Sequence, residues 1–131
     1  MTGNITINAG GILQSGTSGA NLHTIQVGGN IVNNGTLNMT ANAATNQTIQ
    51  FNGSSSKTVS GSGTSTFGNI TLNTTGVSSN VGINKNILVN GVVSWLVDGL
   101  LVVGTSSNIT MGSGATFSWV TSSRYFQLDG L

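Results

Sequence analysis

Short runs of alternating apolar and polar residues recur along the chain. In the runs IQV (25–27), IQF (49–51) and ITL (70–72), two apolar side chains flank one polar side chain. Successive side chains of a β-strand point to opposite faces, so this alternation predicts strands with one buried face. Segments rich in glycine and asparagine, such as 28–30 and 61–63, separate the runs and predict turns. Helical spacing is interrupted almost everywhere by glycine and β-branched residues.

The runs return at nearly constant intervals. Equivalent runs begin 20, 24 and 21 residues apart, at Ile5, Ile25, Ile49 and Ile70. The pair Ser94-Trp95 returns 24 residues later as Ser118-Trp119. Such a period suits one coil of a β-helix, whereas a propeller blade needs about 40 residues. We therefore predict an all-β, parallel β-solenoid of about six coils of 20–24 residues, right-handed because parallel crossovers strongly prefer that hand.

An antiparallel sandwich is the alternative fold. Asn34-Gly35 and Asn90-Gly91 have the residue types of two-residue hairpin turns. Hairpins do not require a recurrence of 20–24 residues, so the solenoid is the preferred prediction. Residues 1–131 would then form one solenoid domain, or one segment of a longer solenoid.

Composition narrows the functional classes. Only 4% of the 131 residues are charged, against about 25% in an ordinary domain. The three cations are scattered and cannot form the basic patch of a nucleic-acid binder, nor an anchor on anionic lipid. The longest apolar run, 100–103, is too short to cross a membrane. We expect no nucleic-acid partner and no membrane insertion. The absence of cysteine excludes disulfides and suits an extracellular protein.

Several segments resemble repeats of large secreted surface proteins of the Bacteroidota. They are VGGNIVNNGTLNM (27–39), TIQFNGSSSKTVSGSGTSTFGNITLN (48–73), VGINKNILVNG (81–91) and ITMGSGATF (109–117). Those proteins are adhesin-like, are predicted to be β-helical and are often exported by the type IX system. The resemblance implies an extracellular or cell-surface scaffold, and it supplies no active-site residues. The segment from Trp119 to Leu131 departs from the repeat style.

Candidates for catalysis are few. The only acidic residues, Asp98 and Asp129, each precede glycine and are expected in turns rather than as a catalytic pair. The single histidine, His23, has no second metal ligand beside it and is expected at a coil corner or facing solvent. The glycine-rich stretch 61–68 lacks the lysine of a phosphate loop and is expected to be a polar corner. We predict no enzyme, no cofactor and no metal site.

An aromatic cluster near the C-terminal end is the best candidate for an interface or a ligand contact. Its members are Trp95, Phe117, Trp119, Tyr125 and Phe126. Aromatic side chains stack on sugar rings and anchor protein interfaces. The interval between Trp95 and Trp119 equals one coil, so an aromatic stack inside the core is the competing interpretation.

Three functions compete. The preferred one is a structural or adhesive rod that associates end to end or belongs to a longer parent chain, because the strand pattern runs along the sequence without a polar cap. A glycan-binding surface module, which uses a flat face of threonine and asparagine together with the aromatic cluster, is the alternative. Ice binding is a weaker possibility, motivated by the outward-facing Thr6, Thr71 and Thr110.

Overall fold

The chain forms only β-strands in the part that its structure describes. The computed structural model describes residues 3–17, 21–41, 46–76, 79–97, 99–118 and 124–128, with the backbone alone for residues 124 and 125. These residues contain sixteen strands and no helix, and each strand pairing among them is parallel. Across the same residues, no helix has the length and apolar character needed to span a bilayer.

The strands form three parallel sheets. Sheet A contains β1 (Ile5–Ile7), β4 (Ile31–Asn33), β7 (Lys57–Ser60), β10 (Asn80–Ile83), β13 (Gly99–Val103) and β16 (Arg124–Leu128). Sheet B contains β2 (Ile12–Gln14), β5 (Thr36–Asn38), β8 (Thr64–Phe67), β11 (Ile87–Val89) and β14 (Ile109–Met111). Sheet C contains β3 (Thr24–Val27), β6 (Thr48–Gly53), β9 (Asn69–Thr74), β12 (Val92–Trp95) and β15 (Thr116–Ser118).

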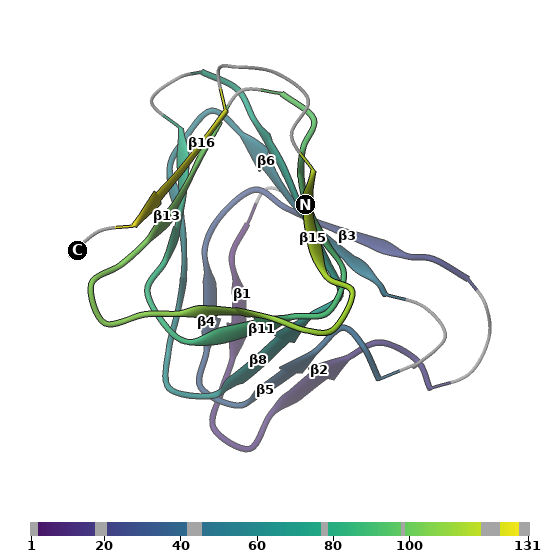
Figure 1. Ribbon diagram of the computed structural model, residues 1–131. Coiled ribbons are helices and arrows are strands. Elements are labelled where there is room, and N and C mark those ends of the chain that lie inside the picture. Colours follow the sequence, from purple (N-terminus) through teal and green to yellow (C-terminus); the bar gives the residue numbers. More distant parts are fainter. Residues whose placement is uncertain are drawn as a thin grey trace.

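Every third strand returns to the same sheet, which makes the chain a β-solenoid. The three sheets enclose a triangular interior (Figure 1). The described strands make five complete coils and the first strand of another, slightly fewer than the six predicted. The predicted all-β parallel solenoid is confirmed, and the antiparallel sandwich is wrong. Asn34-Gly35 and Asn90-Gly91 lie at corners between sheets and do not close hairpins.

The strand register corrects one part of the predicted repeat. Ile25, Ile49 and Ile70 are register partners in sheet C, as the spacing predicted. Ile5 lies in sheet A instead and pairs with Ile31. The alternation of apolar and polar residues is similar in all three sheets, so it does not reveal the sheet to which a run belongs. The sheet A file has intervals of 26, 28, 24, 20 and 25 residues, through Ile5, Ile31, Val59, Ile83, Val103 and Leu128.

Inward-facing side chains from all three sheets form one continuous core. Val27, Phe51, Leu72 and Trp95 follow one another along sheet C and are almost completely buried. The buried apolar residues occupy every second position of the strands, and most of the residues between them are polar, as expected of a sheet with one buried face. Each coil buries its apolar side chains against the coils above and below it, so the fold depends on stacking.

Side-chain amides tie neighbouring coils together at the corners. Asn4 Oδ1 accepts the backbone N–H of Asn30 at 2.8 Å, and Asn30 Oδ1 accepts that of Thr58 at 2.9 Å. Asn69 Oδ1 accepts a hydrogen bond from the backbone N–H of Val92 at 2.9 Å. Each amide satisfies a backbone N–H that the turn would otherwise leave without a partner in the sheet. Such contacts between coils account for the abundance of asparagine.

The corner between sheets A and B has room only for glycine at two successive coils. A Cβ atom on Gly63 would lie 2.0 Å from the carbonyl oxygen of Gly35, and one on Gly35 would lie 2.2 Å from that of Gly11. The stretch 61–68, predicted as a polar corner, contains this corner and also strand β8, whose Phe67 is buried in the core. In β8, outward-facing threonines alternate with the inward-facing Ser65 and Phe67, which is the pattern of a strand with one buried face.

The connections from sheet B to sheet C differ greatly in length. Those of the first two coils take nine residues each, 15–23 and 39–47. The corresponding connections of the next three coils take one, two and four residues: 68, 90–91 and 112–115. The extra residues fall between the same two sheets in adjacent coils, and the strands on either side keep their parallel register.

Candidate functional site

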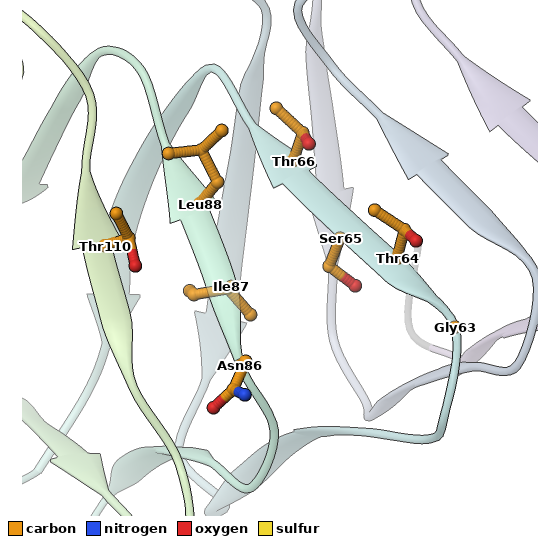
Figure 2. Close-up of a pocket in the computed structure, with 8 residues that line it drawn as sticks. All are labelled: Gly63, Thr64, Ser65, Thr66, Asn86, Ile87, Leu88 and Thr110. Atoms are coloured by element: carbon orange, nitrogen blue, oxygen red, sulfur yellow. The ribbon is translucent and has the colours of Figure 1, made fainter.

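The outer face of sheet B carries a shallow depression of about 430 Å³. We call it the sheet B depression; it is lined by Gly63, Thr64, Ser65, Thr66, Asn86, Ile87, Leu88 and Thr110. These residues come from three consecutive coils, and Figure 2 shows Thr66, Leu88 and Thr110 side by side on β8, β11 and β14. The depression therefore crosses the strands and runs along the solenoid.

The register explains how the lining forms. Thr66, Leu88 and Thr110 are register partners and face outwards, whereas Ser65 and Ile87 face the core and are buried. The small residues of β8 leave space beside the larger Leu88. The lining contains hydroxyl, amide and aliphatic groups, and none of its eight side chains is ionisable. The depression can thus make hydrogen bonds and apolar contacts but offers no acid or base for proton transfer.

Asn86 is held in place at one end of the depression. Its Oδ1 accepts the backbone N–H of Asn108, in the next coil, at 3.0 Å. This bond uses the acceptor of the amide, so the Nδ2 group is the part of Asn86 suited to donate to a ligand.

A buried polar cluster lies beneath the depression and connects three coils. Asn33 is completely buried, and its Nδ2 donates to the carbonyl oxygen of Thr64 at 2.7 Å and to Oγ of Ser65 at 2.9 Å. Lys85 is almost buried, and its Nζ donates to the carbonyl oxygens of Gly63 and Asn33. Hydrogen bonds from inside the solenoid therefore fix the backbone carbonyls of Gly63 and Thr64 and the side chain of Ser65.

The other lysine is buried in the core itself. Lys57 is only 1% exposed, and it precedes Val81, Leu101 and Phe126 in an inward-facing file of sheet A. Its Nζ donates to the carbonyl oxygen of Ser55 at the nearby turn. Burial lowers the pKa of both Lys57 and Lys85 from the ordinary value of 10.5, because water no longer solvates the charged amino groups.

The two buried lysines and Asn33 were not identified from the sequence. A signal was present for Lys57, because in Lys57-Thr58-Val59-Ser60 it occupies the same face as the buried Val59. Asn33 and Lys85 also continue the buried alternation, two residues after Ile31 and Ile83, but both residue types are usually solvated.

The structure brings together three of the five aromatic residues predicted as a contact site. The ring of Phe117 lies 6.4 Å from that of Trp95 and 5.4 Å from that of Phe126, between ring centroids. Trp95 is buried, whereas Phe117 and Phe126 are partly exposed at the C-terminal end of the core. Trp119 and the side chain of Tyr125 lie outside the described part. Among the described members of the cluster, Phe117 and Phe126 are thus the ones that can reach a partner.

A second hollow, of about 170 Å³, lies where the long connections of the first two coils begin. It is lined by Gln14, Ser15, Gly16, His23, Ile25, Met39 and Gln47. His23 is exposed, as its position predicted, and its backbone N–H donates to Oε1 of the buried Gln47. Asp98 and Asp129 lie outside the described residues. No group of three or more His, Cys, Asp or Glu that could hold a metal ion occurs in the ranges that the structure covers.

The threonines that suggested ice binding do not share a face. Thr6 lies in sheet A, Thr71 in sheet C and Thr110 in sheet B. Ordering of water on a flat surface requires these side chains in one file, so the argument for ice binding is wrong.

Comparisons of the chain with protein-family models, curated proteins and solved structures gave no match. Arguments about its function therefore depend on the geometry of the solenoid itself.

Proposed function

We propose that the chain is a non-catalytic structural scaffold of the cell surface or the extracellular space, which extends by end-to-end stacking of solenoids. The observation that carries the proposal is the continuity of the core. One inward-facing file in sheet A runs from Ile5 to Leu128 through every coil, and its partners are joined by parallel ladders throughout. A rod of this kind transmits force along the ladders and sets a fixed distance between its ends.

The terminal coils support stacking. The inward-facing Leu13 and Ile25 of the first coil are only partly buried, as are Met111 and Phe117 at the opposite end. The equivalent side chains of the central coils, for example Leu37 and Ile49, are completely buried. Another coil placed on either end would remove the remaining apolar surface from water, which is favourable by about 25 cal/mol per Å².

Sheet A is expected to make the first contact. The last described strand of sheet A, β16, stands one strand beyond the last described strands of sheets B and C. A second solenoid that approaches this end would therefore meet β16 with its own β1. A head-to-tail contact of this kind is heterologous and continues into an open filament.

Placement outside the cell is also a proposal. It is supported by the absence of cysteine, the very low charge and the resemblance of the repeats to secreted surface proteins. Localisation of a tagged chain in its native host, by surface labelling of intact cells, would test it, and label confined to permeabilised cells would contradict it.

Light scattering combined with negative-stain electron microscopy tests the stacking. We expect species heavier than the 13.2 kDa chain that grow with concentration, and unbranched filaments one solenoid wide. A 13.2 kDa monomer at every concentration, with no filaments, would contradict end-to-end assembly.

A further inference from the structure

We propose that the sheet B depression binds a neutral carbohydrate chain that lies along the solenoid, across the strands. This activity goes beyond the scaffold function, and it would give the rod a specific attachment to a polysaccharide surface. The inference depends on three properties of the depression: its chemistry, its direction and its rigid floor.

The chemistry of the depression matches a sugar. The hydroxyls of Thr64, Thr66 and Thr110 can each donate and accept a hydrogen bond, and the amide of Asn86 can donate one. Sugar hydroxyls need the same mixture of donors and acceptors. Leu88 and the threonine methyl groups supply apolar surface for the C–H face of a sugar ring. Small-molecule sites combine apolar surface with a few well-placed polar groups in this way.

The absence of charge in the lining selects against other ligands. A nucleic acid would require cations to neutralise its phosphates, and an acidic or basic peptide would require opposite charges. None of the eight lining residues can supply them. We therefore infer a neutral polyhydroxylated ligand rather than a sulfated or uronic-acid polymer.

The direction of the depression favours a chain over a single sugar. Thr66, Leu88 and Thr110 lie on adjacent strands of three consecutive coils (Figure 2). Adjacent strands are about 4.8 Å apart, so the three side chains span about 10 Å along the solenoid. A linear oligosaccharide in this orientation meets one outward side chain from each coil.

The floor of the depression is held from inside the solenoid. Asn33 fixes Thr64 and Ser65 through its amide, and Lys85 fixes the carbonyl oxygen of Gly63. A site that needs little ordering on binding loses less of its interaction energy to conformational entropy. Weak individual hydrogen bonds to a sugar can then add up to measurable binding.

The test is a glycan array that carries neutral, sulfated and uronic-acid glycans, followed by calorimetric titration with the neutral oligosaccharide that binds best. The variants are Thr66→Val and Thr110→Val, which remove one hydroxyl each and keep a β-branched side chain. Thr116→Val is the matched control, because Thr116 is exposed in the same coil as Thr110 but lies on sheet C. Circular dichroism verifies that all variants are folded.

We expect binding to neutral glycans, with affinity reduced about five-fold by each site variant and unchanged by Thr116→Val. Three results would overturn the proposal: no neutral glycan bound, binding confined to charged glycans, or equal affinity in Thr66→Val and Thr116→Val. None of these results bears on filament formation, so the carbohydrate site and the scaffold function can fail independently.

Discussion

The amino group of Lys85 donates a hydrogen bond to the backbone carbonyl of Asn33, 3.3 Å away and two coils distant along the solenoid. The same amino group also bonds the carbonyl oxygen of Gly63 in the coil between them. Lys85 thereby links three successive coils at the corner of sheets A and B. No carboxylate accompanies it in the described part of the chain, so backbone carbonyls alone accept its hydrogen bonds.

Replacement of Lys85 by methionine is expected to destabilise the protein. The methionine side chain has a similar length but leaves the carbonyl oxygen of Gly63 without the hydrogen bond from Nζ. Loss of these hydrogen bonds should lower the free energy of unfolding by about 1–2 kcal/mol. Equilibrium denaturation in urea measures the change, and a variant as stable as the parent would show that the link between coils is dispensable.

Replacement of Lys57 by methionine should have the opposite effect. Lys57 is buried in an apolar file with Val81 and Leu101. Its amino group donates a hydrogen bond to the carbonyl oxygen of Ser55. Methionine removes the cost of burying an amino group and keeps most of the packing. We expect the free energy of unfolding to rise by about 1 kcal/mol in the same urea titration. A loss of stability would mean that the bond to Ser55 outweighs desolvation.

The stability of the solenoid should increase as pH rises through the lowered pKa of its buried lysines towards 10.5. Burial lowers the pKa of Lys57 and Lys85 in the folded protein, whereas the unfolded chain keeps the ordinary value of 10.5. Between the lowered pKa and 10.5 the unfolded chain binds more protons, so the free energy of unfolding rises with pH. At pH values below the lowered pKa, both states are protonated and this contribution is constant.

Melting temperatures across this pH range check the effect. The Lys57→Met/Lys85→Met double variant is the control, because it retains every other titrating group. Its melting temperature should be nearly independent of pH over the interval. An equal rise in the double variant would assign the pH dependence to other residues.

Gly63→Ala should prevent normal packing of the corner. The new Cβ atom would lie 2.0 Å from the carbonyl oxygen of Gly35, and backbone on both coils would have to move. We expect a loss of about 3 kcal/mol or more in the free energy of unfolding. Gly3→Ala is the matched control, because a Cβ atom on Gly3 would have nothing within 4 Å of it. Equal stability of the two variants in urea would contradict the close approach of these coils.

The fold was predictable because its determinants are local and repeated. Apolar residues recur at every second position of most strands, and the runs that begin at Ile25, Ile49 and Ile70 have the spacing of one coil. The assignment of Ile5 to the same file was wrong because the alternation marks a strand without naming its sheet. The uneven connections between sheets B and C obscure the period further, so the sheet of each strand follows only from the register.

The candidate site was less predictable than the fold. Thr66, Leu88 and Thr110 are separated by 22 residues in each case, and only the register of β8, β11 and β14 brings them together. Threonine and asparagine are so common in this sequence that no motif distinguishes these positions. The buried Lys85 was equally hidden, since a lysine beside two asparagines at a turn is usually solvated.

End-to-end stacking is tested most directly by a variant that blocks one strand edge. The N–H of Ile5 and the carbonyl of Ile7 bond to the residues that flank β4, so the N–H of Thr6, between them, points to the open edge of β1. Thr6→Pro removes this N–H and leaves the pairing of β1 with β4 intact, since proline is tolerated on edge strands. Thr6→Val keeps the N–H and serves as the control.

The measurement is the mass distribution of both variants by light scattering over a range of concentrations. The scaffold account predicts concentration-dependent assembly for Thr6→Val and a 13.2 kDa monomer for Thr6→Pro, with the same circular dichroism spectrum for both. Equal assembly of the two variants, or monomers in both cases, would contradict stacking through the β1 edge.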